Sequence, residues 1–521
     1  MIRINRKIPV SALQFCVFYP AFIYTISNAL SLPKFMKWFY FKGGTEFSAL
    51  VSFFIIGLCL FIFLFTLLAH RKTIKPVAII FAVLSAFSAY FINKYGIVID
   101  RTMLMNVINT NSTEVSDFMS LHMIPYLLVL MVLPVGLILM TRIHFSDSGR
   151  YLLSSAKLCA GALLLAVGLV YWQFNGISRA VNSSNKYVIQ TLIPINYLQS
   201  FGSIVQNSVE SYLRFHGKKI EFSGRVTSNE NLVVVLAIGE SSRQQNFSLY
   251  GYRRRNTNPL LSTEKNLHIL NGIAKKGSTL YALPEILVKD DVPLPLVTKS
   301  VGIETACYVN YTLYDNCNAV GEIPVSNCKH KTCYDEDVVP LLSNNLKSYR
   351  SGYRFVVLHL GGGSHGPTYD LRHPPEFQAF TPACADPDVV SKCTQEELYN
   401  SYDNTIVYVD SVVSQIIGEL DKSKVPYVFM YLSDHGESLL EEGRIFHGMP
   451  LGIKLPPEQA HVPLLVKSSI PISVANREEY LQTEVFDTVA SLFSIESKIT
   501  DKKLSFITKG SHSLAESVKA N

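Results

Sequence analysis

Acidic and histidine side chains follow directly after apolar stretches at two distant places in the sequence. Glu240 ends the run NLVVVLAIGE, and the adjacent Asp434 and His435 end the run PYVFMYLSDH. Neighbouring side chains of an extended strand point to opposite faces, so Asp434 and His435 can share a ligand only where the strand turns into a loop. Gly436 follows them and permits such a turn. Two carboxylates and one imidazole form a mixed oxygen and nitrogen set that suits zinc or another divalent metal ion.

Two further histidines could extend this set. His365 follows a third apolar run, RFVVLHLGGG, and His447 lies twelve residues beyond His435. Both could form a second polar layer that binds a second metal ion or transfers protons. Ser278 and Thr279 lie at a possible helix start in KKGSTLYALP, although neither would be identified as a nucleophile by itself.

Each of these groups has an ordinary structural explanation when it is taken alone, because a single Asp–His pair is more often structural than catalytic. We expect Glu437, Glu441 and Glu442 to form a solvated loop or a first helical turn, and His461 to be a loop residue. The metal hypothesis therefore depends on several such groups occurring at the ends of three apolar runs.

The elements that must position these groups belong to an α/β domain. Residues 231–240, 354–363 and 426–435 are continuously apolar and rich in β-branched residues, which predicts strands buried on both faces of a parallel sheet. Residues 396–422, between the second and third runs, carry apolar positions at helical spacing. In such sheets the functional site lies at the carboxyl ends of the strands. We expect this domain to span residues 226–521.

The first third of the chain has a different character. The chain has 521 residues, of which 48% are hydrophobic and only 17% charged, which is too apolar for a wholly soluble protein. Five stretches without a charged residue are each near the length that crosses a membrane: 11–29, 47–69, 76–92, 124–140 and 158–174. Buried helices of a soluble bundle fit poorly, because no charged face recurs at helical spacing. We therefore predict an all-α domain of five transmembrane helices over residues 1–175.

Two segments beside these spans leave alternatives open. Three basic residues precede the first span, so it could be a cleaved signal peptide, but the four spans that follow favour a retained anchor. Residues 176–225 mix apolar and polar residues at roughly helical spacing, with breaks at Pro194 and Gly202. This segment could lie along the membrane surface as a bridge or be a plain linker helix.

The cysteines indicate the compartment. Three lie in predicted spans, and the other six fall in three close pairs in the C-terminal part without a zinc-type C-x-x-C spacing. Paired disulfides in an oxidising compartment explain this pattern better than a metal cluster, which places the C-terminal part outside the cytoplasm. The net charge of +6 is modest and spread out, so no nucleic-acid partner is expected.

With these residues assembled, the sequence resembles the bacterial phosphoethanolamine transferases, which include lipid A-modifying and mobile colistin-resistance enzymes of the alkaline phosphatase-like superfamily. The matching stretches are IGESSRQQNFSLYGYRRRNTNPLL, GSTLYALP, GGSHGPTY, SYDNTIVYVD, YLSDHGESL, FHGMP and PPEQAHVPLL. The resemblance covers nearly the whole chain. It implies an α/β alkaline phosphatase/sulfatase-like catalytic domain preceded by five transmembrane helices. It also implies a monomer in the bacterial inner membrane with its catalytic domain in the periplasm.

The resemblance also implies roles for individual residues. It implies a zinc site formed by Glu240, Thr279, Asp434 and His435. Thr279 matches the residue that attacks the donor and carries the phosphoethanolamine. His365 and His447 match histidines implicated in a second zinc ion, in substrate binding or in acid–base work. One tightly bound zinc ion is implied, with room for a second.

Donor-lipid binding is implied for a polar segment of the membrane domain. Asn106, Thr110 and Glu114 match positions linked to the lipid headgroup, but their spacing also fits a plain polar helix face. Asn310 matches an asparagine that relatives place near the substrate. Lipid A-modifying relatives bracket the nucleophile with a disulfide, whereas Lys275 and Glu285 occupy those places here. This departure bears on the acceptor and not on the chemistry.

Two cysteine pairs resemble disulfides of the family, namely Cys328–Cys333 and Cys384–Cys393. A third pair, Cys307–Cys317, is predicted from proximity in the sequence alone. Ser241 and Ser242 depart from the GETT sequence that is common in the family, a change that the site should tolerate.

The function implied is transfer of phosphoethanolamine from phosphatidylethanolamine, through a Thr-linked intermediate, to a glycolipid such as lipid A or a core sugar of lipopolysaccharide. Transfer to a periplasmic glucan or a protein is an alternative acceptor. A phosphoglycerol transferase of the lipoteichoic-acid-synthase type is the rival enzyme, and the disulfide pattern and the HGMP and PPEQ stretches disfavour it. A non-catalytic membrane sensor would be expected to have lost metal ligands, yet every main ligand position is filled.

Overall fold

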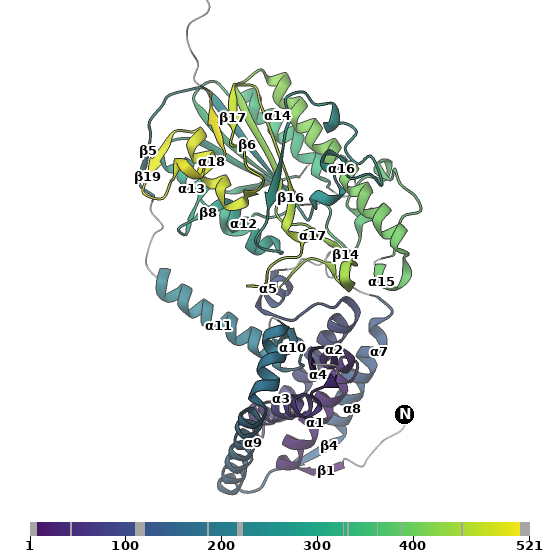
Figure 1. Ribbon diagram of the computed structural model, residues 1–521. Helices are drawn as coiled ribbons and strands as arrows, with labels where there is room; N and C mark the ends of the chain where they lie inside the picture. Colours follow the sequence, from purple (N-terminus) through teal and green to yellow (C-terminus); the bar gives the residue numbers. More distant parts are fainter. Residues whose placement is uncertain are drawn as a thin grey trace, which may run out of the picture. The chain divides into compact units, whose positions relative to one another are not determined.

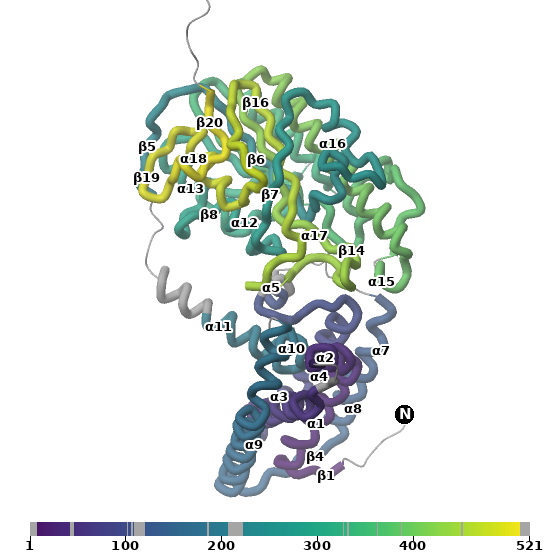
Figure 2. Tube along the Cα trace, in the orientation of Figure 1, coloured from purple at the N-terminus to yellow at the C-terminus, as the bar shows by residue number. Residues whose placement is uncertain are grey.

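The computed structural model describes residues 8–41, 44–109, 120–184, 187–215, 222–326, 328–330, 333–361, 363–386, 388–449 and 452–510. The chain divides into two compact units, Met1–His216 and Gly217–Asn521 (Figures 1 and 2). Each unit has its own buried apolar core. They are described one after the other.

The first unit is a bundle of helices. Its helices are α1 (Ala12–Ala29), α2 (Leu32–Trp38), α3 (Phe47–Leu68), α4 (Ile74–Tyr95), α5 (Arg101–Asn109), α7 (Met123–Leu127), α8 (Leu133–Met140), α9 (Ser148–Ser183), α10 (Tyr187–Gln190) and α11 (Ile195–Phe215). A π-helical stretch, Leu128–Val132, joins α7 to α8. Short strands β1 (Ile8–Ser11) and β4 (Thr141–His144) pair in parallel.

Four helices of the described residues are long and apolar enough to cross a membrane: α3, α4, the continuous Met123–Met140, and α9. Each contains or overlaps one of the predicted spans. The first predicted span corresponds to α1, which is followed by α2 at an angle of 76°. The count is therefore four, or five if this bent pair is one span. Many side chains of these helices are apolar and exposed, as expected of surfaces that face lipid.

Close packing of α3 against α9 depends on a glycine. A Cβ atom built at Gly176 would lie 2.6 Å from the Cβ of Ala49 and 2.6 Å from Oε2 of Glu46. Small residues let helix backbones approach closely, which is how transmembrane helices associate. Helix α9 also continues to Ser183, beyond the predicted end of the fifth span.

Part of the predicted bridging segment packs inside the first unit. The side chain of Asn28 in α1 donates to the carbonyl of Ile193 at 2.7 Å and accepts from its N–H at 3.0 Å. Leu192 and Ile193 are buried in the helical core. A new helix begins beyond Pro194, as the sequence suggested, whereas α11 runs without a break through Gly202. The connection to the second unit is therefore anchored among the helices before α11 begins.

Removing this anchor should destabilise the first unit. In Asn28→Ala, the buried N–H and C=O of Ile193 would lose their partners, which we expect to cost about 1–3 kcal/mol of the free energy of unfolding. Thermal unfolding of the full chain in detergent measures the effect. Asn182→Ala is the control, because the Asn182 side chain is exposed and donates to Ser178 at 3.3 Å. Equal transition temperatures for the two variants would contradict the anchoring role.

The second unit is built on an eight-stranded sheet with the order β11-β10-β12-β6-β13-β16-β7-β18. The strands are β6 (Leu232–Gly239), β7 (His268–Ile273), β10 (Glu304–Val309), β11 (Glu322–Pro324), β12 (Tyr353–Leu360), β13 (Tyr427–Ser433), β16 (His461–Ser468) and β18 (Tyr480–Leu481). The first five in this order run parallel, and β16 is antiparallel to both of its neighbours. The three predicted strands are confirmed as β12, β6 and β13, the adjacent centre of the sheet.

Helices cover both faces of this sheet (Figure 1). Alternate residues of β6, from Leu232 to Ile238, pack in one core with α12 (Thr279–Leu287), α13 (Leu294–Ser300) and α18 (Val485–Leu492). Helices α14 (Val339–Ser348) and α16 (Gln395–Ser423) pack against each other on the other side. Every residue of β6 is buried, as continuous apolar strands require. The predicted helix at 396–422 is confirmed as α16.

One buried histidine of this sheet is outside the predicted site. His359, the penultimate residue of β12, is 0% exposed. Burial is the main cause that lowers the pKa of its imidazole, to about 4. His359 is therefore neutral in the folded protein at neutral pH.

Acid should destabilise the protein partly through His359. Its folded pKa of about 4 lies below the ordinary 6.5, so between these values the unfolded chain binds a proton that the folded chain does not. The free energy of unfolding then falls as the pH decreases, by up to about 1.4 kcal/mol per pH unit from this group. The transition temperature of the wild type should fall between neutral pH and about pH 5, and this fall should be smaller in His359→Phe. Both are measured with a chelator present. A loss equal to that of the control His268→Asn would contradict this assignment.

Candidate active site

The carboxyl ends of β6 and β13 bring two acidic residues and a histidine together. Glu240 directly follows β6, and Asp434 and His435 directly follow β13, the parallel neighbour of β6. Their ligand atoms all lie within 4.8 Å of one another. Nε2 of His435 is 3.2 Å from Oδ2 of Asp434 and 3.5 Å from Oε1 of Glu240. The structure thus joins the three groups that sequence spacing alone could only place at strand ends.

Thr279 contacts the same cluster from a different element. It is the first residue of α12, and its hydroxyl donates to Oε2 of Glu240 at 2.9 Å. The same oxygen lies 3.4 Å from Nε2 of His435. The first N–H groups of a helix have no partner within the helix, so they and the helix dipole favour an anion at this end. The Thr279 hydroxyl therefore lies both beside a ligand set that suits a metal ion and at a helix end that favours an anion.

The protonation and bonding of these groups fit a divalent metal ion. Oδ1 of Asp434 accepts from the N–H of Ser241 at 3.0 Å and of His435 at 2.7 Å, while the buried Oδ2 has no hydrogen-bond partner among the described residues. Nδ1 of His435 faces the carbonyl of Gly436 at 3.0 Å, which assigns its proton there and leaves Nε2 as a lone-pair donor. Burial, followed by the charge of Asp434, raises the pKa of Glu240 well above its ordinary value. A bound cation would give Oδ2 of Asp434 a partner and would lower the pKa of Glu240 again.

Two serines hold the loop after β6. Ser241 adopts a left-handed backbone conformation with φ of 56°, and its hydroxyl donates to Oε1 of Glu240 at 2.7 Å. The N–H of Ser242 donates to the hydroxyl of Ser433 at 2.8 Å. A non-glycine residue with positive φ is strained and persists only where its surroundings fix it. Both departures from the GETT sequence therefore take part in the site.

Gly363, just after β12, lets the backbone of Glu240 come close to it. A Cβ atom at Gly363 would lie 2.4 Å from the carbonyl oxygen of Glu240. The N–H of Gly363 donates to Asp335 at 2.9 Å, and Asn310 donates to the other oxygen of the same carboxylate at 2.8 Å. Asn310 is thus connected to Glu240 through Asp335 and Gly363, and its role in substrate binding stays a prediction.

The two additional histidines lie in contact with the first. The ring centroids of His365 and His447 are 4.7 Å apart, and those of His447 and His435 are 4.5 Å apart. Nδ1 of His365 faces the carbonyl of Gly366 at 2.6 Å. Burial, with the neighbouring His447 and Arg372, lowers the pKa of His365 well below its ordinary value. The structure thus places His365 and His447 beside His435, so that the three imidazoles form a row; their predicted role in metal binding or proton transfer stays a prediction.

Glu437 has a place that sequence reasoning missed. It is 0% exposed, and its carboxylate lies 2.8 Å from Nδ1 of His447. It also accepts from the N–H of Gly366 at 3.0 Å and from the hydroxyl of Tyr369 at 2.9 Å. The expectation of a solvated loop is wrong for this residue, because it fixes both outer histidines. Its position next to the Asp–His pair was the only signal for it in the sequence.

The neighbouring glutamates differ from Glu437. Glu441 pairs with the guanidinium of Arg243 at 2.6 Å, and Arg243 is itself only 2% exposed. Arg243 also donates to the carbonyl of Glu437 at 3.2 Å and lies over the ring of Tyr402. Glu442 is exposed, as expected of a solvated loop. A buried arginine therefore ties the loop after β13 to the loop after β6, a contact that no local pattern predicted.

Other predicted residues lie elsewhere. His461 is the first residue of β16 and is not in a loop, because it pairs with Ile273 of β7. Asn106 belongs to α5, but its side chain, Thr110 and Glu114 lie outside the described residues. The expected donor-lipid contacts of these three residues therefore stay a prediction.

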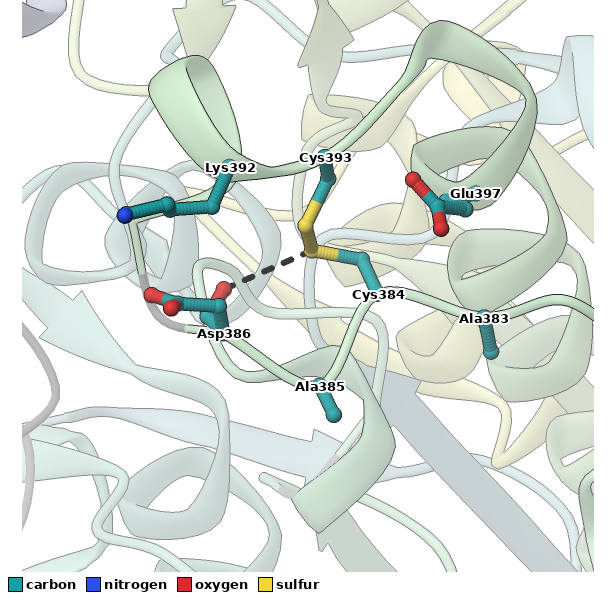
Figure 3. Close-up of a pocket in the computed structure, with 7 residues that line it drawn as sticks. All are labelled: Ala383, Cys384, Ala385, Asp386, Lys392, Cys393 and Glu397. Atoms are coloured by element: carbon teal, nitrogen blue, oxygen red, sulfur yellow. Dashed lines mark hydrogen bonds between the residues drawn. A yellow bond between two sulfur atoms is a disulfide. The ribbon is translucent and has the colours of Figure 1, made fainter.

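The six C-terminal cysteines form the three predicted pairs, Cys307–Cys317, Cys328–Cys333 and Cys384–Cys393. The last pair lines an open pocket of about 450 Å³ together with Lys392 and Glu397 (Figure 3). No residue of the metal set lines this pocket, so it is separate from the candidate site.

An ion pair brackets the nucleophile candidate next to the positions, Lys275 and Glu285, at which relatives were expected to have a disulfide; it is made by Lys276, the residue after Lys275. Nζ of Lys276 lies 3.6 Å from Oε1 of Glu285, with Thr279 between them in the sequence. Both side chains are partly exposed. The pair joins the segment before α12 to the last turns of that helix.

Comparison with known proteins assigns the family. Residues 57–209 match the family model described as "Phosphoethanolamine transferase EptA/EptB", and residues 295–495 match the model "Sulfatase". The chain is 30% identical over 515 residues to phosphoethanolamine transferase EptA of Helicobacter pylori, covering 93% of this chain and 94% of that protein. It is 26% identical over 459 residues to Kdo(2)-lipid A phosphoethanolamine 7''-transferase of Escherichia coli K12, covering 80% and 78%.

A solved structure supports the fold over the whole chain. The lipooligosaccharide phosphoethanolamine transferase A of Neisseria meningitidis superposes with a TM-score of 0.82 at 23% identity, covering 96% of this chain and 98% of that one. The second unit therefore has the alkaline phosphatase/sulfatase-like fold, and the first unit is a membrane domain of the same kind. With a relative of 30% identity along nearly its full length, this chain belongs to the phosphoethanolamine transferase family.

Proposed function

We propose that this protein transfers phosphoethanolamine from phosphatidylethanolamine, through a covalent intermediate on Thr279, to a glycolipid of the cell envelope. One observation carries the proposal. The hydroxyl of Thr279, at the first residue of α12, lies 2.9 Å from Glu240 and 3.4 Å from His435 inside a buried ligand set. Membership of the phosphoethanolamine transferase family agrees with this chemistry.

Glu240, Asp434 and His435 would hold a zinc ion, with the Thr279 oxygen as a fourth neighbour. Two carboxylates, one imidazole nitrogen and an oxygen form a set that zinc accepts. When bound, zinc would supply Lewis-acid stabilisation of negative charge on oxygen and favour the ionised form of the hydroxyl. His365, His447 and Glu437 offer further donors beside this set, which leaves room for a second ion.

In the first step, Oγ1 of Thr279 attacks the phosphorus of the donor. The bond between Oγ1 and phosphorus forms, and the bond between phosphorus and the glycerol oxygen breaks, so diacylglycerol leaves. Oε2 of Glu240, which accepts from the hydroxyl at 2.9 Å, takes its proton and returns it when the Thr279 hydroxyl is restored in the second step. The N-terminal N–H groups of α12 are placed to stabilise the phosphoryl oxygens.

His447 would supply the proton to the departing glycerol oxygen. Its Nδ1 is held by the buried carboxylate of Glu437 at 2.8 Å, so Nε2 is the nitrogen available for proton transfer. A carboxylate behind an imidazole fixes its tautomer and stabilises its charged form. His365 lies against His447 and is the alternative proton donor.

In the second step, an oxygen of the acceptor attacks the same phosphorus. The bond from phosphorus to Oγ1 breaks and the Thr279 hydroxyl is restored, while a histidine takes the proton of an acceptor hydroxyl. A lipopolysaccharide acceptor, either lipid A or a core sugar, agrees with the name of the Kdo(2)-lipid A transferase relative. A periplasmic glucan or a protein is the alternative.

The membrane unit would present both lipids to the site. We propose that Asn106, Thr110 and Glu114 contact the donor headgroup. The three disulfides of the second unit fit an oxidising compartment, so the catalytic domain would lie in the periplasm and the helices in the inner membrane. The protein would act as a monomer.

Replacement of the nucleophile should abolish the covalent intermediate. Incubation of the full-length protein with zinc and headgroup-labelled phosphatidylethanolamine should add one phosphoethanolamine to the wild type and none to Thr279→Ala. Thr279→Ser keeps a hydroxyl and should form the adduct more slowly. Intact-protein mass measures each outcome. An adduct on Thr279→Ala would refute the assignment, and an adduct only from labelled phosphatidylglycerol would support the rival phosphoglycerol transferase.

Removal of metal or of a ligand should stop the first step. Chelation should abolish diacylglycerol release, and added zinc should restore it. Asp434→Asn should lower zinc affinity by about 10-fold or more, because the buried Oδ2 has no other partner among the described residues. Zinc per protein, determined by elemental analysis after dialysis, tests this directly. The exposed Glu442→Gln is the control and should retain full zinc.

A further inference from the structure

A buried glutamine outside the proposed ligand set lies where three segments of the site meet. Gln459 is 2% exposed and belongs to α17 (Pro457–Ala460), directly before β16. Neither the metal set nor the proposed proton transfers use it. Its amide nitrogen makes two hydrogen bonds, as buried polar groups generally do.

Gln459 makes hydrogen bonds to Gly436 and Ser438, the residues on either side of Glu437. Its backbone carbonyl accepts from the N–H of Gly436 at 2.9 Å. Its side-chain Nε2 donates to the hydroxyl of Ser438 at 2.9 Å and to the carbonyl of Phe446 at 3.0 Å. Ser438 and Phe446 are paired partners of the small sheet formed by β14 (Ser438–Leu439) and β15 (Ile445–Phe446). The side chain therefore fastens both strands that carry the chain from Glu437 to His447.

The third segment is the one that leads to the nucleophile. A Cβ atom at Gly277 would lie 3.0 Å from Oε1 of Gln459, so the amide packs directly against this backbone. The carbonyl of Gly277 accepts from the N–H of Gly448 at 2.6 Å. Gln459 thus lies between the residues that precede Thr279 and those that flank His447.

The residue before His447 needs such a constraint. Phe446 has a φ of 63°, a left-handed conformation that is unfavourable for a bulky side chain. Its ring packs against Gly366, where a Cβ atom would be 2.6 Å from the ring. Pairing with β14, this ring contact and the hydrogen bond from Gln459 hold Phe446 in place. Loss of the hydrogen bond would let the backbone at Phe446 relax and move His447.

We propose that Gln459 is a positioning residue that sets the imidazole of His447 relative to Thr279. The inference rests on the proposed function, in which His447 transfers a proton. The side chain of Gln459 does not bond to Glu240, Asp434 or His435 in the described structure. Its loss therefore changes proton transfer and leaves zinc binding at Glu240, Asp434 and His435 in place.

Two substitutions of similar length test this role. Gln459→Met removes the donor, and Gln459→Glu places a carboxylate against the carbonyl of Phe446. In the full-length protein with zinc, we expect each to lower the rate of adduct formation from labelled phosphatidylethanolamine about 10- to 100-fold. Zinc affinity, measured by competition with a chelator, should stay within about threefold of the wild type. Thermal unfolding of both variants identifies any that fail to fold.

Gln482 offers a matched control because it is another buried glutamine that bonds directly to a residue of the metal set. Its buried Nε2 donates to the carbonyls of Ser433 and Asp434, both at 2.7 Å. Gln482→Glu places the same charge beside the residues of the metal set, so it should lower zinc affinity. A loss of zinc from the Gln459 variants equal to that of Gln482→Glu would overturn the proposal, as would an unchanged rate.

A double-substitution cycle separates positioning from general stability. If Gln459 acts through His447, Gln459→Met should have no further effect on the rate in a His447→Ala protein. Fully additive losses would show that Gln459 acts on another group and would overturn the inference.

A readout without the substrate distinguishes this inference from the proposed function. The His447 side chain is 13% exposed, so its modification by diethylpyrocarbonate should be slow in the wild type and several-fold faster in Gln459→Met. Peptide mass spectrometry measures the rate, with His268 as the internal reference. Faster modification in a protein that transfers no headgroup would support the positioning and refute the transfer. Equal modification rates in an active enzyme would refute the positioning alone.

Discussion

The repulsion between two buried carboxylates is the constraint around which the second unit is built. Parallel pairing of β6 and β13 puts Glu240 and Asp434 beside each other at the carboxyl ends of two central strands, out of contact with water. Two such charges are costly to bury unless a cation or several hydrogen bonds compensate them. The backbone and side-chain donors around Asp434 and Glu240 compensate part of this cost. Nε2 of His435 faces Oδ2 of Asp434, the oxygen that these donors do not reach. The strand register itself thus assembles a ligand set that suits a divalent metal ion.

Outside this pair, each layer of the site fixes the layer within it. Glu437 orients His447, while Arg243 holds the loop that contains Glu437 and stacks on Tyr402 of α16. Tyr402 in turn donates to the carbonyl of Ser241, the residue after Glu240. These contacts therefore connect the outer residues back to the metal set. These bonds are made among buried groups, where a satisfied polar network gives one arrangement rather than many. The site is therefore held together by residues from three separate stretches of the sequence.

Much of this arrangement could be predicted from the sequence, and what could not has a physical reason. Continuous apolar runs identified β6, β12 and β13, because burial on both faces leaves no room for alternation. The membrane helices followed from their length and lack of charge. Glu437 and Arg243 could not be found in this way, because burial of a charged side chain depends on partners that are distant in the sequence. The bent start of the first unit, α1 followed by α2, was hidden because composition reports hydropathy and not direction.

The ion pair between Lys276 and Glu285 gives the nucleophile segment a distinct vulnerability. None of the three disulfides described in the second unit joins residues that flank Thr279 in the sequence, so a thiol reductant would cut other cross-links and leave this bracket intact. A partly exposed pair of opposite charges is instead weakened by dissolved ions, whose screening length is only about 10 Å at 0.1 M salt. The residue proposed to carry the transferred group is thus braced by charge, which salt weakens, and not by sulfur, which reductants cleave.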